Sequence, residues 1–147
     1  MAKEIERKYL VVDNSFVEMA QSVVHICQGY ISRRPEGTVR IRIKGNKGFI
    51  TIKGKNEGVT RDEWEYEIPL NDALQMLEKA CEGSVIDKHR HIVEYDGYTW
   101  EVDVFHGSHE GLIIAEIELT SADEKFSLPP FIGQEVTGNP EYYNSNL

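Results

Sequence analysis

Charged side chains stand at every second position along much of this chain. Residues 3–10 read KEIERKYL, in which Glu4, Glu6 and Lys8 share one parity, while Ile5, Tyr9 and then Val11 occupy the other, broken by Arg7. Successive side chains of a β-strand point to opposite sides, so this segment predicts a strand with one ionic and one largely apolar face. A single strand of this kind is typical of a solvated surface. Its meaning therefore depends on whether the pattern recurs.

The pattern recurs, and its charges are sorted by sign. Further along the chain, rows of basic or acidic residues at alternate positions are interleaved with apolar residues. The basic rows are Arg40 and Arg42, Lys53, and Lys88 and Arg90; the acidic rows are Glu63, Glu65 and Glu67, Glu101 and Asp103, and Glu116 and Glu118. A solvated surface normally intersperses both signs. We therefore favour a charged face that is turned inward, the alternative being a β-sandwich whose outer face is ionic.

Turn signals divide the chain into short strands. Pro-Glu-Gly at 35–37, the glycine-rich stretch 45–48 and Asp96-Gly97 each separate segments of alternating character, as in β-hairpins. The chain thus predicts eight strands, over residues 3–12, 23–34, 38–45, 48–55, 60–68, 85–95, 98–106 and 111–120.

Two helices and a tail complete the expected elements. The better helix starts near residue 71 or 72 and places Leu74, Leu77 and Cys81 on one face. A weaker helix is expected over residues 14–21. The tail beyond residue 130 has little periodicity, and Tyr142 and Tyr143 predict that it packs back on the molecule.

Eight antiparallel strands can close into a barrel whose interior receives every second side chain. We therefore predict an α+β, mainly β fold: a closed eight-stranded antiparallel barrel with a charged interior, its apolar parity packed outside against the helices and the tail. The inward set would hold nine acids and six bases. Uncompensated buried charges cost on the order of several kcal/mol each, so such an interior requires water and ligands.

The charges of this interior indicate what the ligand would be. Lys and Arg side chains that converge from several strands suit an elongated polyanion, and phosphate oxygens match them best. The acids would repel the same anion unless a divalent cation such as Mg²⁺ or Mn²⁺ bridged carboxylate and phosphate oxygens. Carboxylates, metal and basic residues around a phosphate chain are the equipment of phosphoryl transfer.

Length and net charge restrict the remaining possibilities. A chain of 147 residues predicts a single domain, 1–147, and a formal charge of −9 argues against a nucleic acid or a membrane as partner. Without a signal peptide or a membrane-spanning run, we expect a cytoplasmic protein. Cys27 and Cys81 lack metal-ligand spacing and are interpreted as small apolar residues. His89 and His91 have the outward parity, and no metal site is predicted there.

In their order along the chain, these motifs resemble the CYTH superfamily, also called triphosphate tunnel metalloenzymes. Glu4-x-Glu6-x-Lys8 is similar to its ExExK signature. The other matching stretches are Val39 to Arg42, Thr51 to Gly54, Glu63 with Glu65, Lys88 with Arg90, Glu101 to Phe105, Ala115 to Leu119, Glu135 to Thr137, and Tyr143 with Asn144. The superfamily includes inorganic, thiamine and RNA triphosphatases and class IV adenylate cyclases.

The resemblance implies a role for each inward residue. Metal ligands, for Mg²⁺ or Mn²⁺ and two ions per site, would be Glu4, Glu6, Asp103, Glu116 and Glu118. Triphosphate oxygens would be bound by Lys8, Arg40, Arg42, Lys53, Lys88 and Arg90. The catalytic set would be Lys8, Glu63, Glu65, Asp103 and Tyr30, with the acids serving the second metal and the attacking water. For Tyr30, near the tunnel mouth, ordinary packing on a neighbouring strand is the alternative.

The sequence favours a metal-dependent triphosphatase that converts tripolyphosphate to pyrophosphate and phosphate. Few inward residues could form a nucleoside pocket, which argues for a linear substrate over ATP. A class IV-type adenylate cyclase, a thiamine or nucleoside triphosphatase and a non-hydrolysing polyphosphate-binding module are the alternatives. A homodimer is left open.

Overall fold

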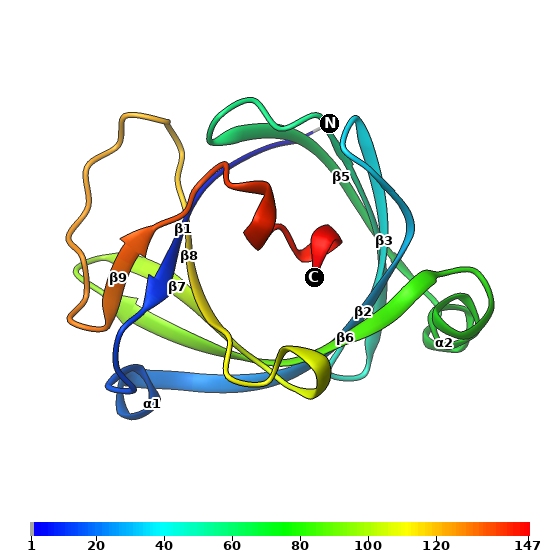
Figure 1. Cartoon of the computed structure of the whole chain (residues 1–147), viewed down its shortest axis with the longest axis horizontal. Helices are drawn as coiled ribbons and strands as arrows, with labels where there is room; N and C mark the ends of the chain where they lie inside the picture. The colour runs from blue at the N-terminus through cyan, green and yellow to red at the C-terminus, as the bar shows by residue number, and fades with distance from the viewer. Residues whose placement is uncertain (1) are drawn as a thin grey trace.

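Eight antiparallel strands form a closed barrel in the computed structural model, which describes residues 2–147. They pair in the order β5-β4-β3-β2-β6-β7-β8-β1, and β1 also pairs with β5, which closes the ring (Figure 1). The strands are β1 Ala2–Val11, β2 Ala20–Arg34, β3 Gly37–Lys44, β4 Lys47–Gly54, β5 Thr60–Ile68, β6 Glu82–Tyr95, β7 Tyr98–Phe105 and β8 Ile113–Glu118. The predicted fold is confirmed, although β2 and β6 each begin three residues earlier than expected.

Tight hairpins fix the register between neighbouring strands. The turn between β6 and β7 places Asp96 at φ 50° and Gly97 at φ 80°, the left-handed pair that a two-residue hairpin loop requires. Gly45 likewise adopts φ 62° between β3 and β4. Because one residue of slip would turn every side chain to the other face, these turns keep the charged rows inside the barrel.

The apolar parity packs outside the ring, as expected. A cluster around buried Trp100 and Phe16 lies between the strands, helix α1 Phe16–Met19 and the loop 119–131. Strand β9 Ile132–Glu135 then pairs with the second half of β1. The outward face of β5 is less covered, and Tyr66 is 62% exposed. No helix within residues 2–147 is long and apolar enough to span a membrane.

Both helices differ from expectation in detail. Helix α1 has four residues instead of the expected eight, because the chain becomes extended at Ala20 to begin β2. Helix α2 Leu70–Lys79 buries Ala73 and leaves Leu74 51% exposed, so its inner face is rotated from the expected one. Ala73 meets the barrel at Gly48, where a Cβ would lie 2.6 Å from the Ala73 Cβ. Only small residues permit this close approach, and it sets the rotation of the helix.

The tail is the larger correction, because it enters the barrel instead of packing on its apolar outside. After β9 the chain makes two short 3-10 turns, η2 Pro140–Tyr142 and η3 Asn144–Asn146, and its C-terminus lies within the ring in Figure 1. Tyr142 and Leu147 pack against an apolar cluster inside the barrel. This apolar plug consists of Tyr30, Ile86, Phe105 and Ile114, with Leu112, Tyr142 and Leu147 packed on it.

Candidate active site

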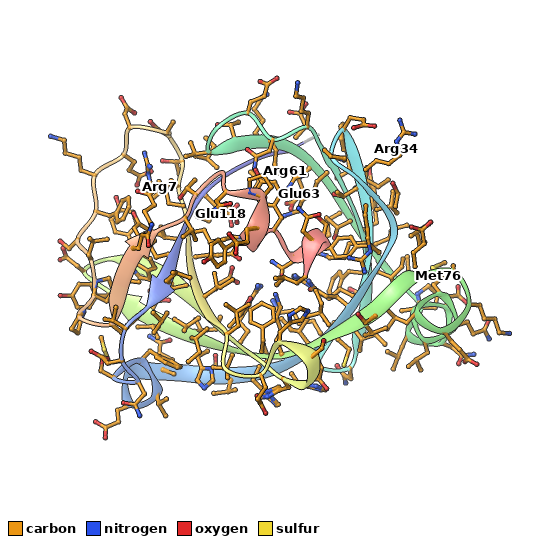
Figure 2. The ribbon with its side chains drawn as sticks, viewed as in Figure 1. Arg7, Arg34, Arg61, Glu63, Met76 and Glu118 are labelled. Atoms are coloured by element: carbon orange, nitrogen blue, oxygen red, sulfur yellow. The ribbon has the colours of Figure 1, made fainter. Side chains whose placement is uncertain are left out.

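A cavity of about 210 Å³ lies inside the barrel, and it is lined almost entirely by charged and polar side chains. Twelve of the fourteen residues singled out from the sequence line it. They are Glu4, Glu6, Lys8, Tyr30, Arg40, Arg42, Lys53, Glu63, Glu65, Arg90, Glu116 and Glu118. Glu63 and Glu118 are labelled among the inward side chains of Figure 2. Lys88 and Asp103 are not part of the lining.

Strand register gathers the acids on one side of the cavity. Glu6 of β1 pairs directly with Glu118 of β8, and Glu116 pairs with Lys8 on one side and Glu101 on the other. Glu4 precedes Glu6 on the same face of β1. We call Glu4, Glu6, Glu116 and Glu118 the acid cluster. Glu67, also expected inside, is exposed near the end of β5 and does not line the cavity.

The acid cluster holds more negative charge than its cations balance. Lys53 Nζ lies 2.8 Å from Glu4, and Lys8 Nζ lies 3.7 Å from Glu116. Burial, together with the charges of Glu116 and Glu4, raises the pKa of Glu6 well above its ordinary value. Burial and the charges of Glu4 and Glu101 likewise raise the pKa of Glu118. Carboxyl groups whose pKa is raised in this way are influenced more by burial and neighbouring acids than by nearby cations.

Within this cluster, the pKa values of Glu6 and Glu116 shift in opposite directions. Burial opposes ionisation of Glu116, but Lys8 and a hydrogen bond from Glu6 outweigh it and lower the pKa of Glu116 to about 2. Of the two, Glu6 is therefore the weaker acid and holds a proton more tightly. A divalent cation could replace this proton, because carboxylate oxygens are the ligands that hard cations such as Mg²⁺ and Mn²⁺ prefer. The donor set of the acid cluster thus fits such a metal.

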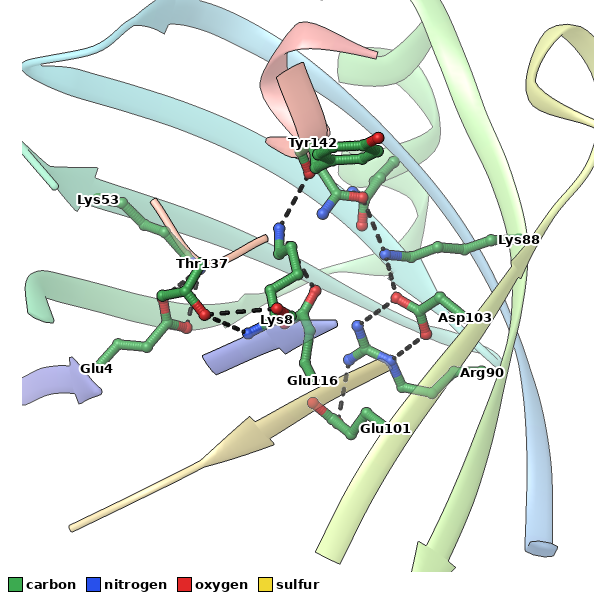
Figure 3. Close-up of polar contacts among 12 residues, drawn as sticks. Glu4, Lys8, Lys53, Lys88, Arg90, Glu101, Asp103, Glu116, Thr137 and Tyr142 are labelled. Atoms are coloured by element: carbon green, nitrogen blue, oxygen red, sulfur yellow. Dashed lines mark hydrogen bonds and ion pairs between the residues drawn. The ribbon is translucent and has the colours of Figure 1, made fainter. Parts of the chain in front are cut away.

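Asp103 is bound differently, in a buried triad with Lys88 and Arg90. Asp103 Oδ2 lies 2.7 Å from Lys88 Nζ, and both Asp103 oxygens accept hydrogen bonds from Arg90, at 2.8 and 2.9 Å (Figure 3). The side chains of Lys88 and Asp103 are 0% and 2% exposed. Burial opposes ionisation of Asp103, yet the two cations hold its pKa well below the ordinary value.

This arrangement bears on the predicted roles of Asp103 and Lys88. Both Asp103 oxygens are already engaged by cations beneath the cavity lining, so the geometry suits positioning of Arg90 better than metal ligation. Lys88 Nζ also donates to Asn144 Oδ1, at 3.2 Å, and burial, with Arg90 and Arg42 adding to it, lowers the Lys88 pKa to about 7.

Three arginines of the lining, Arg40, Arg42 and Arg90, form what we call the basic wall of the cavity. Hydrogen bonds within the protein do not use all of its donors. Arg42 donates from Nε to Gln28 Oε1 at 2.8 Å, and burial together with Arg40 and Arg90 lowers its pKa to about 9. Arg40 donates to Thr51 Oγ1 at 3.0 Å, but its buried Nε has no partner among the described residues. Crowded guanidinium groups with an unsatisfied donor form a site for an anion with several oxygens.

Several cavity residues were missed at the sequence level. Some of them follow the same alternation beyond the chosen rows: Thr38 and Lys44 on β3, and Arg61 on β5. The tail contributes others, for which no periodic signal existed: Thr137, Gly138, Tyr143, Asn144 and Ser145. Of these, Thr137, Tyr143 and Asn144 lay in stretches that carried the family resemblance, but they were assigned no role. Figure 3 shows Lys8 donating to the Tyr142 carbonyl, at 3.1 Å, so the tail occupies donors that face the cavity.

Comparison with known proteins agrees with this geometry. Residues 2–146 match the CYTH domain. An inorganic triphosphatase of Acetivibrio thermocellus is 47% identical over 147 residues, covering 100% of this chain and 94% of the relative. An inorganic triphosphatase of Nitrosomonas europaea is 35% identical over 148 residues, covering 98% and 95%. The crystal structure of the inorganic triphosphatase NE1496 superimposes with a TM-score of 0.69 at 33% identity, covering 99% of this chain and 94% of that one.

Proposed function

This chain belongs to the CYTH family, and we propose that it is a metal-dependent enzyme that hydrolyses inorganic tripolyphosphate to pyrophosphate and phosphate. The full-length similarity to inorganic triphosphatases supports the reaction class. Within the molecule, the cavity is the main support for this proposal. Its acid cluster has too few neighbouring cations to balance its charge, and its arginines have donors that no anion satisfies. A triphosphate with a divalent cation satisfies both walls. We also propose that residues 2–147 act as one domain, because β1 pairs with β8 and β9.

The basic residues would bind and orient the substrate. Arg40, Arg42 and Arg90 offer planar donor pairs to phosphate oxygens, while Lys8 and Lys53 offer point charges. A linear chain of phosphates held between these two groups presents its terminal phosphorus at one end of the cavity. Positioning and charge neutralisation account for most catalysis of phosphoryl transfer.

The acid cluster would hold the metal, Mg²⁺ or Mn²⁺, through Glu4, Glu6, Glu116 and Glu118. When bound, such a cation withdraws charge from phosphate oxygens and lowers the pKa of a water molecule. We propose two ions, with Glu63 and Glu65 near the second and Lys53, 3.4 Å from Glu63, fixing that carboxylate.

The bond changes would follow from this placement. Oxygen of an attacking water forms a bond to the terminal phosphorus, and the bond from that phosphorus to the bridging oxygen breaks, which leaves pyrophosphate. The water proton passes to a carboxylate, for which Glu63 is suited, because burial and the charge of Glu4 raise its pKa above the ordinary value.

Substrate choice would follow from the polarity of the lining. Among the described residues, Tyr30 and Tyr143 are the aromatic side chains of the lining, and Tyr30 is already packed in the apolar plug. Three other aromatic side chains, Trp64, Tyr66 and Trp100, belong to the outward parity. Stacking of a base therefore has little support, whereas three phosphates are served by ionic contacts from both walls.

A phosphate-release assay tests this proposal directly. Tripolyphosphate, ATP, GTP and thiamine triphosphate are compared at one pH with Mg²⁺, with Mn²⁺ and in chelator. We expect kcat/KM for tripolyphosphate to exceed that for ATP at least about tenfold, which corresponds to roughly 1.4 kcal/mol. Equal use of ATP, or formation of cyclic AMP with pyrophosphate, would contradict the assignment and favour the cyclase alternative.

A further inference from the structure

A second group of metal-ligating side chains lies on the outside of the barrel. Strands β2 and β6 pair so that His25 stands opposite His89 and Cys27 opposite Asp87. These four alternate with residues of the inward parity, such as Lys88 and Arg90 in β6, so they project away from the cavity. None of the four lines it. Strand pairing thus assembles a nitrogen, sulfur and oxygen donor set that no sequence spacing reveals.

The donor atoms already point at one another. His25 Nε2 lies 2.7 Å from Asp87 Oδ1 and 3.7 Å from Cys27 Sγ. One ligand atom from each of the three residues lies within 4.8 Å of the others. Two ligands at zinc-like bond lengths of about 2.0–2.3 Å and a tetrahedral angle are separated by roughly 3.3–3.6 Å. Small side-chain movements would therefore suffice to admit an ion.

Neighbouring histidines hold this arrangement in place. The ring of His89 stacks on that of His25, with 4.8 Å between centroids and 29° between planes. His89 Nδ1 in turn lies 2.7 Å from Nε2 of His106, which follows β7. His25 and Asp87 are each about half exposed, at 49% and 50%, so an ion from solvent can reach them.

We propose that His25, Cys27 and Asp87 bind one transition-metal ion of the Zn²⁺ class on the outer face of β2 and β6. Imidazole and thiolate favour softer ions such as Zn²⁺ and Co²⁺, whereas the all-carboxylate acid cluster suits Mg²⁺ and Mn²⁺. The two sites therefore select different ions and lie on opposite sides of the barrel wall. An ion at the outer site joins two adjacent strands and stabilises the barrel without entering the cavity.

Cobalt provides a probe with a readout other than activity. A Co²⁺–thiolate bond gives a near-ultraviolet charge-transfer band, and the chain has only two cysteines, Cys27 and Cys81. The full chain is titrated with Co²⁺ in excess Mg²⁺, which occupies the acid cluster. We expect a band that saturates at one ion per chain and that Zn²⁺ abolishes. Cys27→Ser should remove the band, and the matched control Cys81→Ser should retain it.

The other two ligands are tested by affinity. His25→Ala and Asp87→Ala should each weaken Co²⁺ binding at least about tenfold, in line with the loss of a ligand, while the control His109→Ala leaves it unchanged. Absence of the band, its survival in Cys27→Ser, or unchanged affinity in His25→Ala and Asp87→Ala would overturn the proposal. Mg²⁺-dependent phosphate release, measured on the same variants, reports separately on the cavity and should not follow the cobalt signal.

Discussion

Two carboxylate centres inside one barrel behave in opposite ways. Asp103 is fully buried, yet Lys88 and Arg90 bind both of its oxygens and hold its pKa low. Glu6 lies on the cavity wall among other acids, and its pKa is raised. The difference is the number of cations within reach, not the depth of burial. A carboxylate with its own cations is satisfied within the protein, while carboxylates without them are those that an ion from outside would stabilise.

Metal removal should separate the two centres most strongly. In chelator we expect phosphate release from tripolyphosphate to fall to background and to return with Mg²⁺ or Mn²⁺, because the uncompensated acids otherwise repel the substrate. The fold should persist, because the Asp103 triad needs no metal. Phosphate release with and without chelator, alongside circular dichroism, checks both statements. Undiminished turnover in chelator would remove the basis for a metal at the acid cluster.

Substitution within the acid cluster should abolish activity and spare the fold. Glu4→Gln and Glu116→Gln each remove a proposed metal ligand while they relieve repulsion among acids, so we expect kcat to fall at least about 100-fold. The metal-free variants should still fold but unfold at a lower temperature than the parent protein, because Glu4 and Glu116 are ion-paired with Lys53 and Lys8. An unfolded circular dichroism spectrum would instead make these glutamates structural.

Substitution of Asp103 should have the reverse signature. Asp103→Asn leaves Lys88 and Arg90 buried without their carboxylate, and breaking a buried ion pair costs about 3–5 kcal/mol. Denaturant unfolding in chelator measures the loss, with Glu118→Gln as the matched control that should cost nothing. A stability loss below about 1 kcal/mol would mean that the triad is not the self-sufficient centre described above.

Substitution of an arginine in the basic wall should have a smaller effect, which is confined to the KM for the substrate. Arg42→Ala should raise KM for tripolyphosphate by the equivalent of about 1–3 kcal/mol, the worth of a charge-assisted hydrogen bond. Initial rates over a range of substrate concentrations give the value. Normal KM and turnover would show that the Arg42 guanidinium, which bonds Gln28, does not reach the substrate.

The smallest expected effect is on stability against pH. Glu6, Glu63 and Glu118 have folded-state pKa values above 4.5, so the metal-free protein should lose stability as pH rises through those values. Because the pKa of Glu116 is lowered to about 2, this residue instead reduces stability as the pH falls from 4.5 to 2. In chelator, Tm should fall by at least about 2 °C between pH 4.5 and 7.

Addition of millimolar Mg²⁺ at pH 7 should recover this loss, because the ion replaces the protons that the acids give up. Calorimetry over this pH range, with and without Mg²⁺, checks the prediction. A metal-free Tm that rises steadily from pH 4.5 to 7 would contradict the raised pKa values.

Alternation along the chain determined the barrel and the direction of its charges. Period-two order is local, so it can be read from any strand alone, and it placed residues such as Lys8, Arg40 and Glu116 inside correctly. The same rule extends to Lys44 and Arg61, which were missed because only the clearest rows were followed. The family resemblance rested on these same rows, and the match of residues 2–146 to the CYTH domain bears it out.

Only the tertiary structure shows which residues that are far apart in the sequence come into contact. Alternation does not show which inward residues face the cavity and which, like Asp103, form ion pairs with residues of the next strand. The strand register decides this, because it sets which side chains stand opposite each other. It also gave no sign that the tail enters the barrel, since Tyr142 and Leu147 are drawn there by an apolar cluster assembled from four strands. Likewise, His25, Cys27 and Asp87 become neighbours only when β2 pairs with β6. Local patterns fix which way a side chain points, but long-range contacts decide what it meets.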